Sequence, residues 1–196
     1  MSQAVEFFFD VGSPTAYLAW TQLPALCAKA GATLIYRPML LGGVFQATGN
    51  ASPAAVAAKG RYMNADMARY AKAYGVPLAI NPHFPINTLT LMRGAAGVQL
   101  RLPARFDDYL RGVFKAMWVD GLNMNDPAVA AKALMAAGFD PAEIMALTAD
   151  AEAKAALRAS TEEAVARGAF GAPTMFVGDA MFFGQDRLEF VRAALG

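Results

Sequence analysis

The chain has 196 residues, the size of one domain or of one domain with a large insertion. Hydrophobic residues make up 56% of it and charged residues 17%, a composition that excludes an intrinsically disordered chain. The formal net charge is +1 with both signs mixed along the sequence, so no basic stripe points to a nucleic-acid partner.

The N-terminal residues do not resemble a signal peptide, because they contain the acidic Glu6 and no basic segment. Residues 11–28 and 38–58 lack charged side chains for about the length of a membrane span. Prolines and uncharged polar residues interrupt both stretches, which indicates buried protein. We therefore expect a cytoplasmic protein without a membrane partner.

The first part of the chain predicts a strand, a helix and a second strand. Residues 4–9 are almost all apolar and have the length of a buried strand. Ser13 and Pro14 suit the N-cap and the first position of a helix that extends to about residue 30. Residues 33–39 then return to a strand pattern.

The middle of the chain is predicted to be helical. Ser52 as an N-cap and Pro53 at the first helical position begin one helix, as Ser13 and Pro14 do, and Gly75 ends it. Its large side chains are expected to form the core of the insert, and some to line an apolar substrate pocket: Tyr62, Met63, Met67, Tyr70 and Tyr74. Further helices are expected after an Asn87 cap, over 106–118, after Asp126, after Asp140, and over 150–167.

The strand pattern returns near the C-terminus. Residues 174–177 and 180–183 flank Gly178-Asp179, a two-residue hairpin signal. Asp186 is then expected to cap a final helix over 187–195. The order of elements predicts an α/β fold in which one mixed sheet is interrupted by a long helical insertion.

Two short segments are candidates for chemistry. Ser13 begins a helix, where four backbone N–H groups lack partners and the helix dipole stabilises an anion such as a thiolate. Its position alone favours a simple helix cap. Pro173 opens a strand after a glycine bend, so its bond to Ala172 could be cis and leave that backbone free for a ligand. On its own, Pro173 fits an ordinary trans proline.

Taken together, these parts resemble the thioredoxin superfamily, in the arrangement of the disulfide oxidoreductases that carry a helical insert. In that family a Cys-x-x-Cys motif begins the first helix, and a cis-proline loop faces it. Ser13 and Ala16 stand at the two cysteine positions, which excludes dithiol exchange. The resemblance implies a thioredoxin-like domain from residues 1–50 and 168–196, with an all-helical insertion domain over 51–167.

Six motifs are similar to kappa-class glutathione transferases and 2-hydroxychromene-2-carboxylate isomerases. In chain order they are FFFDVGSPTAYL, RPMLLGGVFQATGN, HFPINTL, FKAMWVDGLNMNDP, GAPTMFV and FFGQDRL. The resemblance covers nearly the whole chain. The loop after the second strand and the overall length favour the isomerases over the transferases.

The resemblance implies glutathione as the cofactor, with its sulfur beside the Ser13 hydroxyl. The Ala172 backbone, next to Pro173, would pair with the cysteinyl part of the tripeptide. Gln185 and Asp186 would hold its γ-glutamyl end, since a carboxylate suits an ammonium group. Matching positions also assign Asn50 and Lys59 to this ligand, although Lys59 fits a solvated surface lysine equally well.

The substrate side of the site is implied at Gln46 and Asn87. Many of the isomerases carry a lysine where this chain has Gln46, and that lysine is positioned to meet the substrate carboxylate. Glutamine donates a hydrogen bond but lacks the charge, so the resemblance allows a substrate with a different acidic group. Two other reactive side chains are read as structural: His83 as a loop residue and Cys27 as a small buried residue.

The reaction implied by the resemblance is a glutathione-dependent cis–trans isomerisation of an aromatic ring-cleavage product, such as 2-hydroxychromene-2-carboxylate. It belongs to aromatic hydrocarbon catabolism and needs no metal, and the enzyme is expected to be a homodimer. Two alternatives stay open: a kappa-like glutathione S-transferase, and a redox-dead thioredoxin-like module that binds peptides.

Overall fold

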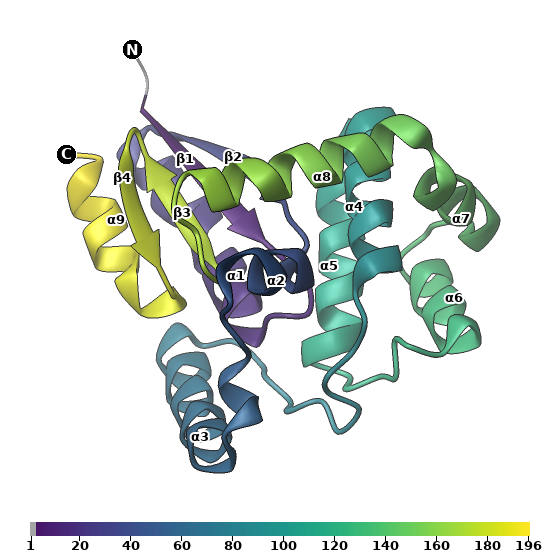
Figure 1. Ribbon diagram of the computed structural model, residues 1–196, viewed down its shortest axis with the longest axis horizontal. Coiled ribbons are helices and arrows are strands. Elements are labelled where there is room, and N and C mark those ends of the chain that lie inside the picture. Colours follow the sequence, from purple (N-terminus) through teal and green to yellow (C-terminus); the bar gives the residue numbers. More distant parts are fainter. Residues whose placement is uncertain (1–2) are drawn as a thin grey trace.

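The computed structural model describes residues 3–196, and its centre is one mixed sheet of four strands (Figure 1). The strands are β1 (Ala4–Phe9), β2 (Thr33–Pro38), β3 (Thr174–Val177) and β4 (Ala180–Phe183), in the order β2-β1-β3-β4. β1 runs parallel to β2 and antiparallel to β3, while β3 and β4 form the expected hairpin. All four predicted strands are confirmed.

The central strand β1 is covered on both faces. Phe7 and Phe9 point to one face, where they join the main core with α1 (Pro14–Ala30) and α5 (Phe106–Trp118). Phe8 points to the other face and packs with residues of α2 and α8. Because successive side chains of a strand alternate between faces, an unbroken apolar run marks a strand buried on both sides.

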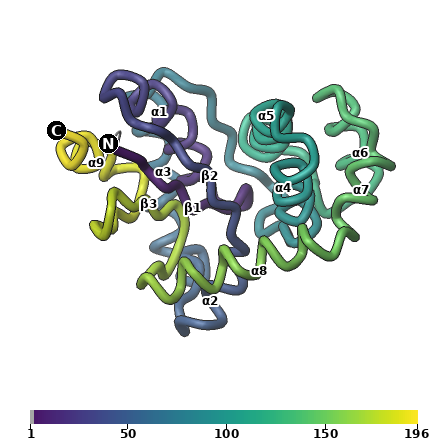
Figure 2. Tube along the Cα trace, turned by 90° about the horizontal axis from the view of Figure 1, so that it is seen from above, coloured from purple at the N-terminus to yellow at the C-terminus, as the bar shows by residue number. Residues whose placement is uncertain are grey.

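The helical segment lies between the two halves of the sheet in sequence. Its helices are α2 (Leu41–Thr48), α3 (Ala57–Tyr74), α4 (Leu89–Arg101), α5, α6 (Pro127–Ala136), α7 (Pro141–Ala149) and α8 (Ala151–Ala166), and α9 (Leu188–Ala194) follows the hairpin. In Figures 1 and 2, α4 to α7 stand beside the sheet, and α8 returns from them to it. The α/β class with a helical insertion is therefore confirmed.

Several helix starts follow the predicted cap chemistry. Asp126 and Asp140 each accept a hydrogen bond from the first turn of the helix that follows, as predicted. Asp150, which was not predicted as a cap, accepts two at the start of α8. The Asn87 side chain accepts one from the amide of Leu89, the first residue of α4. Local side-chain acceptors thus satisfy donors that a helix start leaves unpaired.

Four expectations were wrong. Residues 41–48 form α2, where the sequence predicted no helix, and α3 begins at Ala57 because Pro53–Ala55 form a separate 3₁₀ turn. Asp186 does not cap the last helix, since it lies inside a 3₁₀ turn at 185–187 and pairs with its neighbour Arg187. Tyr62 is not a core residue of the insert, because it is 61% exposed.

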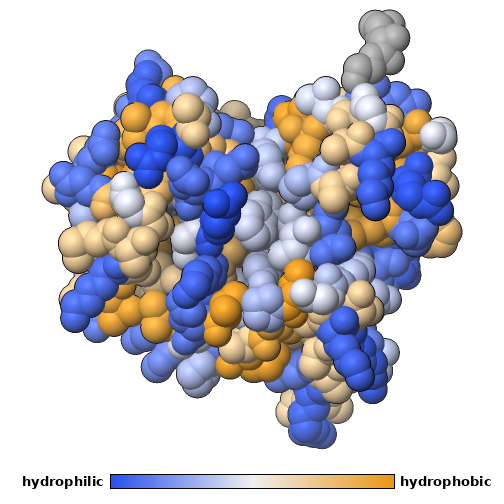
Figure 3. All heavy atoms as spheres, turned by 180° about the vertical axis from the view of Figure 1, so that it is seen from behind, coloured by the Kyte–Doolittle hydropathy of each residue, from blue (hydrophilic) through white to orange (hydrophobic). Residues whose placement is uncertain are grey.

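The surface shows no single dominant kind of side chain on the face seen from behind. Apolar and charged residues are interspersed there (Figure 3). Within residues 3–196, every helix is too short or too polar to cross a membrane.

Candidate active site

The candidate site is centred on Ser13, which lies between the end of β1 and the start of α1. Its side chain is 4% exposed, and its hydroxyl oxygen accepts a hydrogen bond from the Ala16 amide at 3.1 Å. The expected N-cap is therefore confirmed. The same hydroxyl donates to the carbonyl oxygen of Ala172 at 3.0 Å. This second bond connects the helix start to a loop far away in sequence.

That loop contains a cis peptide bond between Ala172 and Pro173. Both residues are buried, and the Ala172 carbonyl accepts from two hydroxyl groups, those of Ser13 and Thr15 at 3.0 and 3.1 Å. The two hydroxyl oxygens also lie 2.9 Å apart. These three short contacts share two hydroxyl protons. The Ser13 hydroxyl can therefore rotate and donate to another acceptor while the Thr15 hydroxyl still donates to the Ala172 carbonyl.

Asp10 holds the loop that precedes Ser13. Its carboxylate is 1% exposed and accepts from the amides of Gly12 and Leu41, both at 2.8 Å, and from the Thr88 hydroxyl at 3.0 Å. Its own carbonyl accepts from the Ser13 amide. Burial raises the pKa of the Asp10 carboxyl, and the three hydrogen bonds oppose that shift. One buried side chain therefore fixes the starts of α1, α2 and α4 relative to one another.

Two side chains of the helical insert also contact the loop that precedes Ser13. The indole nitrogen of Trp118 donates to the Val11 carbonyl at 2.8 Å, and the Val11 amide lies 3.3 Å from the sulfur of Met92. Both partners are buried. The position of Ser13 therefore depends on the insert as well as on the sheet.

A second group of site residues lies on the turn after β4. Gln185 is 5% exposed, and its side-chain amide has no hydrogen-bond partner between residues 3 and 196. Its carbonyl accepts from the hydroxyl of Tyr74 on α3 at 2.6 Å. Burial, and then the nearby Tyr70 and Asp186, raise the pKa of Tyr74 to about 12, so this hydroxyl remains a donor. Asp186 is exposed and pairs with Arg187.

The remaining predicted site residues lie on exposed positions. Asn50 follows α2, and its amide donates to the carbonyl of Phe170 at 2.8 Å, which joins it to the segment before the cis bond.

Gln46 on α2 and Lys59 on α3 are exposed and form no hydrogen bond or ion pair in the described part of the chain. Asn87 is exposed, and its side chain is used by the start of α4. No hydrogen bond or ion pair in residues 3–196 joins Lys59 or Asn87 to Ser13.

Sequence reasoning missed the roles of three residues of this site: Asp10, Thr15 and Tyr74, the last of which it had assigned to the core of the insert or to an apolar pocket. Asp10 ends an apolar strand, an unusual place for a carboxylate, and this signal could have marked it. Thr15 and Tyr74 had no such signal, because the partner of each lies more than a hundred positions away.

Metal ligation finds no support in the described residues. No group of three or more His, Cys, Asp or Glu side chains there is arranged to hold an ion. His83 lies exposed in a loop, as expected. Cys27 is buried in α1, and burial raises the pKa of its thiol, which disfavours the reactive thiolate.

Comparisons with known proteins agree with this geometry. The family of DsbA-like thioredoxin domains matches residues 4–196. A 2-hydroxychromene-2-carboxylate isomerase of Sphingobium xenophagum is 30% identical, with 100% of this chain and 99% of that protein covered. Glutathione S-transferase kappa 1 of Homo sapiens is 28% identical over 100% and 92% of the two chains. A solved structure of a 2-hydroxychromene-2-carboxylate isomerase has a TM-score of 0.84 at 30% identity, covering 98% of this chain and 94% of that one.

Proposed function

Because the chain belongs to the family of DsbA-like thioredoxin domains and, within it, to the 2-hydroxychromene-2-carboxylate isomerases, we propose that it is a glutathione-dependent cis–trans isomerase. Its proposed substrate is an aromatic ring-cleavage product such as 2-hydroxychromene-2-carboxylate. The same matches confirm the thioredoxin-like fold that the sequence predicted. The observation that carries the proposal is the position of the Ser13 hydroxyl. It lies at the start of α1, beside the cis bond between Ala172 and Pro173.

The residues present fit glutathione by two unsatisfied polar groups. The amide N–H of Ala172 donates no hydrogen bond within residues 3–196, so it is free to pair with the backbone of a peptide ligand. The side-chain amide of Gln185 also has no hydrogen-bond partner in the described residues, and its polar atoms still reach the surface of this largely buried residue. Polar groups at largely buried positions usually have a hydrogen-bond partner, so these two groups are available to a bound molecule or to water. We assign Ala172 to the cysteinyl part and Gln185 to the γ-glutamyl part.

The other assigned contacts are weaker. Asp186 would attract the α-ammonium group of the ligand in competition with Arg187. Asn50 lies next to the cis-proline loop through its bond to Phe170, and Lys59 would meet the glycyl carboxylate. Pro173 shapes the loop. On the substrate side we propose Gln46 and Asn87.

When bound, glutathione would supply a thiolate that adds reversibly to an unsaturated carbon of the substrate and so allows rotation about that bond. The task of Ser13 is to donate its hydroxyl proton to the sulfur, a stronger interaction when the sulfur is an anion. The unpaired N–H groups and dipole of the α1 start favour the same charge. Thr15 keeps the Ala172 carbonyl satisfied while Ser13 turns.

Several broader features remain proposals of the same kind. The thioredoxin-like domain is proposed to comprise residues 1–50 and 168–196, with residues 51–167 as the insertion domain. We propose a homodimeric, cytoplasmic enzyme of aromatic hydrocarbon catabolism that binds a small aromatic substrate.

The second candidate function is that of a kappa-like glutathione transferase, which the similarity to the kappa enzymes favours. A transferase would release the glutathione conjugate, whereas an isomerase would return glutathione unchanged. A redox-dead peptide-binding module would use the same residues around Ser13 and Ala172 without catalysis.

One experiment separates the three functions. Glutathione is titrated into the protein by calorimetry, and 2-hydroxychromene-2-carboxylate and hydroxybenzylidene-pyruvate are then followed by absorbance with catalytic amounts of glutathione. Conversion to the equilibrium mixture of the two isomers, with all the glutathione recovered, supports the isomerase. Consumption of one glutathione per substrate supports the transferase, and absence of glutathione binding contradicts both enzymes.

A further inference from the structure

A hollow of about 520 Å³ lies between α2, α4 and α8. Its walls include six apolar side chains: Leu40, Ala47, Leu89, Leu157, Val165 and Ala166. We call it the α8 pocket. Neither Ser13 nor Ala172 nor Gln185 lines it, so it is not the space around the candidate active site.

Positive charge surrounds these apolar walls. Arg93 of α4 and Lys154 of α8 are half-buried, and Arg158 of α8 is exposed. None of the three forms an ion pair or a hydrogen bond between residues 3 and 196, and Glu162 is the one carboxylate at the pocket. A partly desolvated guanidinium without a partner is unfavourable, and a carboxylate would relieve that cost through two parallel hydrogen bonds.

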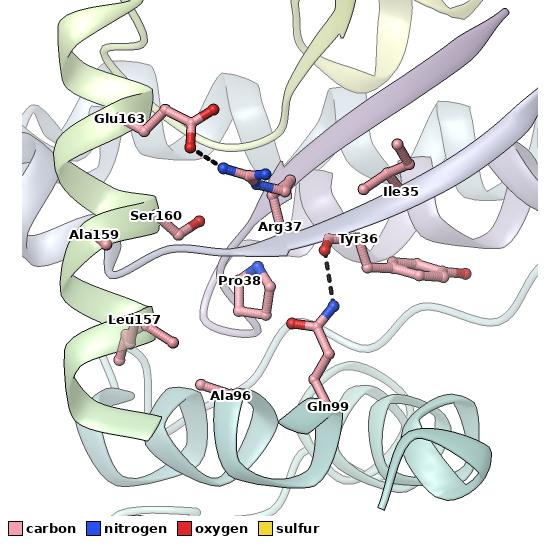
Figure 4. Close-up of a pocket in the computed structure, with 11 residues that line it drawn as sticks. Ile35, Tyr36, Arg37, Pro38, Ala96, Gln99, Leu157, Ala159, Ser160 and Glu163 are labelled. Atoms are coloured by element: carbon pink, nitrogen blue, oxygen red, sulfur yellow. Dashed lines mark hydrogen bonds and ion pairs between the residues drawn. The ribbon is translucent and has the colours of Figure 1, made fainter. Parts of the chain in front are cut away.

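A neighbouring hollow provides a comparison, because the positive charge that lines it is paired with carboxylates of the chain. It has about 350 Å³ and lies between β2, α4 and α8 (Figure 4). There Arg37 pairs with Glu163 and also with Glu6, while the Gln99 amide donates to the Tyr36 carbonyl. Its one cation is already neutralised by partners in the chain. The α8 pocket differs because its cations have no such partners.

We propose that the α8 pocket binds a small amphipathic carboxylate, with an aromatic body against the apolar walls and its carboxylate on Arg93. Lys154 and Arg158 supply further positive charge at the rim. The volume lies within the range of about 300–1,000 Å³ that is usual for small-molecule sites. The site is separate from the glutathione site, and its occupancy does not require glutathione.

The test is a calorimetric titration of the full chain with 2-naphthoate in the absence of glutathione. 2-Naphthamide serves as the matched neutral ligand, because it has the same ring system without the charge. We expect 2-naphthoate to bind at least about tenfold more tightly than the amide, a difference that corresponds to about 1.4 kcal/mol. Arg93→Gln should weaken naphthoate binding by about the same factor and leave the amide unchanged.

Two variants keep this test decisive. Lys154→Gln provides a second removal of charge if Arg93→Gln does not fold, and Lys132→Gln on α6 removes an exposed cation that does not line the pocket. Weaker naphthoate binding in the pocket variants but not in Lys132→Gln supports the site. Equal affinity for the two ligands, or binding unaffected by both pocket substitutions, overturns it.

Competition with glutathione separates this proposal from the proposed function. Saturating glutathione should leave the naphthoate affinity unchanged, and so should Ser13→Ala. Displacement of naphthoate by glutathione would overturn a separate site. Because the titrations that compare 2-naphthoate with 2-naphthamide contain no glutathione, a failure of the isomerase assignment would not alter their outcome.

Discussion

The hydroxyl oxygen of Ser13 lies 3.0 Å from the carbonyl oxygen of Ala172, although the two residues are 159 positions apart. This bond joins the first helix of the thioredoxin-like fold to the cis-proline loop. It also shows how the hydroxyl at the first cysteine position of the fold is oriented. A ligand sulfur at this place would compete with the Ala172 carbonyl for the Ser13 proton.

Ser13→Ala should reduce turnover by at least about tenfold and leave glutathione binding largely intact. Loss of the hydroxyl raises the pKa of the bound thiol, and each unit lowers the thiolate fraction at neutral pH about tenfold. Loss of the N-cap should also cost about 1 kcal/mol of stability. The measurement is the ultraviolet thiolate absorbance of bound glutathione against pH.

The matched control for this substitution is Ser160→Ala. Its hydroxyl is buried on α8 and has no hydrogen-bond partner in the described residues. It should leave turnover and the thiolate titration unchanged. Superimposable titration curves and full activity in Ser13→Ala would reduce Ser13 to a helix cap, and the peptide-binding module would become the better reading.

Thr15→Val should lower turnover less than Ser13→Ala does. Without the Thr15 hydroxyl, the Ala172 carbonyl retains only Ser13 as a donor, so turning Ser13 toward sulfur would leave a buried acceptor unsatisfied. We therefore expect a raised thiol pKa, measured by the same absorbance titration. Thr15→Ser keeps the hydroxyl and should behave like the wild type. Equal effects of the valine and serine variants would contradict this role.

Asp10→Asn should destabilise the fold by about 1–3 kcal/mol, because an amide group replaces one of two oxygens that accept hydrogen bonds from the chain. Urea unfolding followed by circular dichroism measures the change. Asp120→Asn is the control: its carboxylate lies in a surface pair with Lys115, and such pairs contribute about 0–1 kcal/mol. Similar losses in the two variants would show that Asp10 does not organise the loop.

The elements with local signals were predictable from the sequence. Helix starts are marked by Ser13 with Pro14 and by the aspartates at 126, 140 and 150. The serine and aspartate side chains accept hydrogen bonds from backbone amides of the first helical turn. The hairpin of β3 and β4 was predicted from Gly178-Asp179 in the same way. In each of these elements the stabilising contact is made within a few residues.

Helix α2 could not be predicted, and the reason lies in its partners. Its N-cap residue, Leu40, offers no side-chain acceptor, and two glycines in its first turn lower helix propensity. The amides of Leu40 and Leu41 are instead satisfied by Thr161 and Asp10, which lie 121 and 31 positions away. The tertiary fold therefore stabilises this helix, and a sequence window does not contain that information.

The candidate site divides along the same line. Ser13 and Pro173 could be singled out because a helix start and a strand-opening proline are local features. The role of the Ser13 and Thr15 hydroxyls can be recognised only after the fold has placed the Ala172 carbonyl beside them. Tyr74 enters the site only because α3 packs near the turn at 185–187.

Tyr74→Phe should weaken glutathione binding about two- to tenfold, since a typical hydrogen bond contributes about 0.5–1.5 kcal/mol. The Tyr74 hydroxyl donates to the Gln185 carbonyl and so holds the turn proposed to bind the γ-glutamyl end. Calorimetric titration gives the dissociation constant. Tyr62→Phe removes an exposed hydroxyl of the same helix and should change nothing. Unaltered affinity in Tyr74→Phe would show that the turn keeps its position without this bond.

Gln46→Lys should improve the use of a pyruvate-bearing substrate, mainly through a lower KM. Gln46 is exposed on α2 and engages no other side chain in residues 3–196, so a lysine can extend there without breaking a contact. A charge-assisted hydrogen bond to a carboxylate is about twice as strong as a neutral one. The gain should disappear with the methyl ester of the same substrate, which lacks the carboxylate. Gln22→Lys, which adds the same charge on α1, controls for the change in net charge. A KM that stays the same for the acid would show that position 46 does not face the substrate, and a gain shared by the ester would show that charge recognition is not its cause.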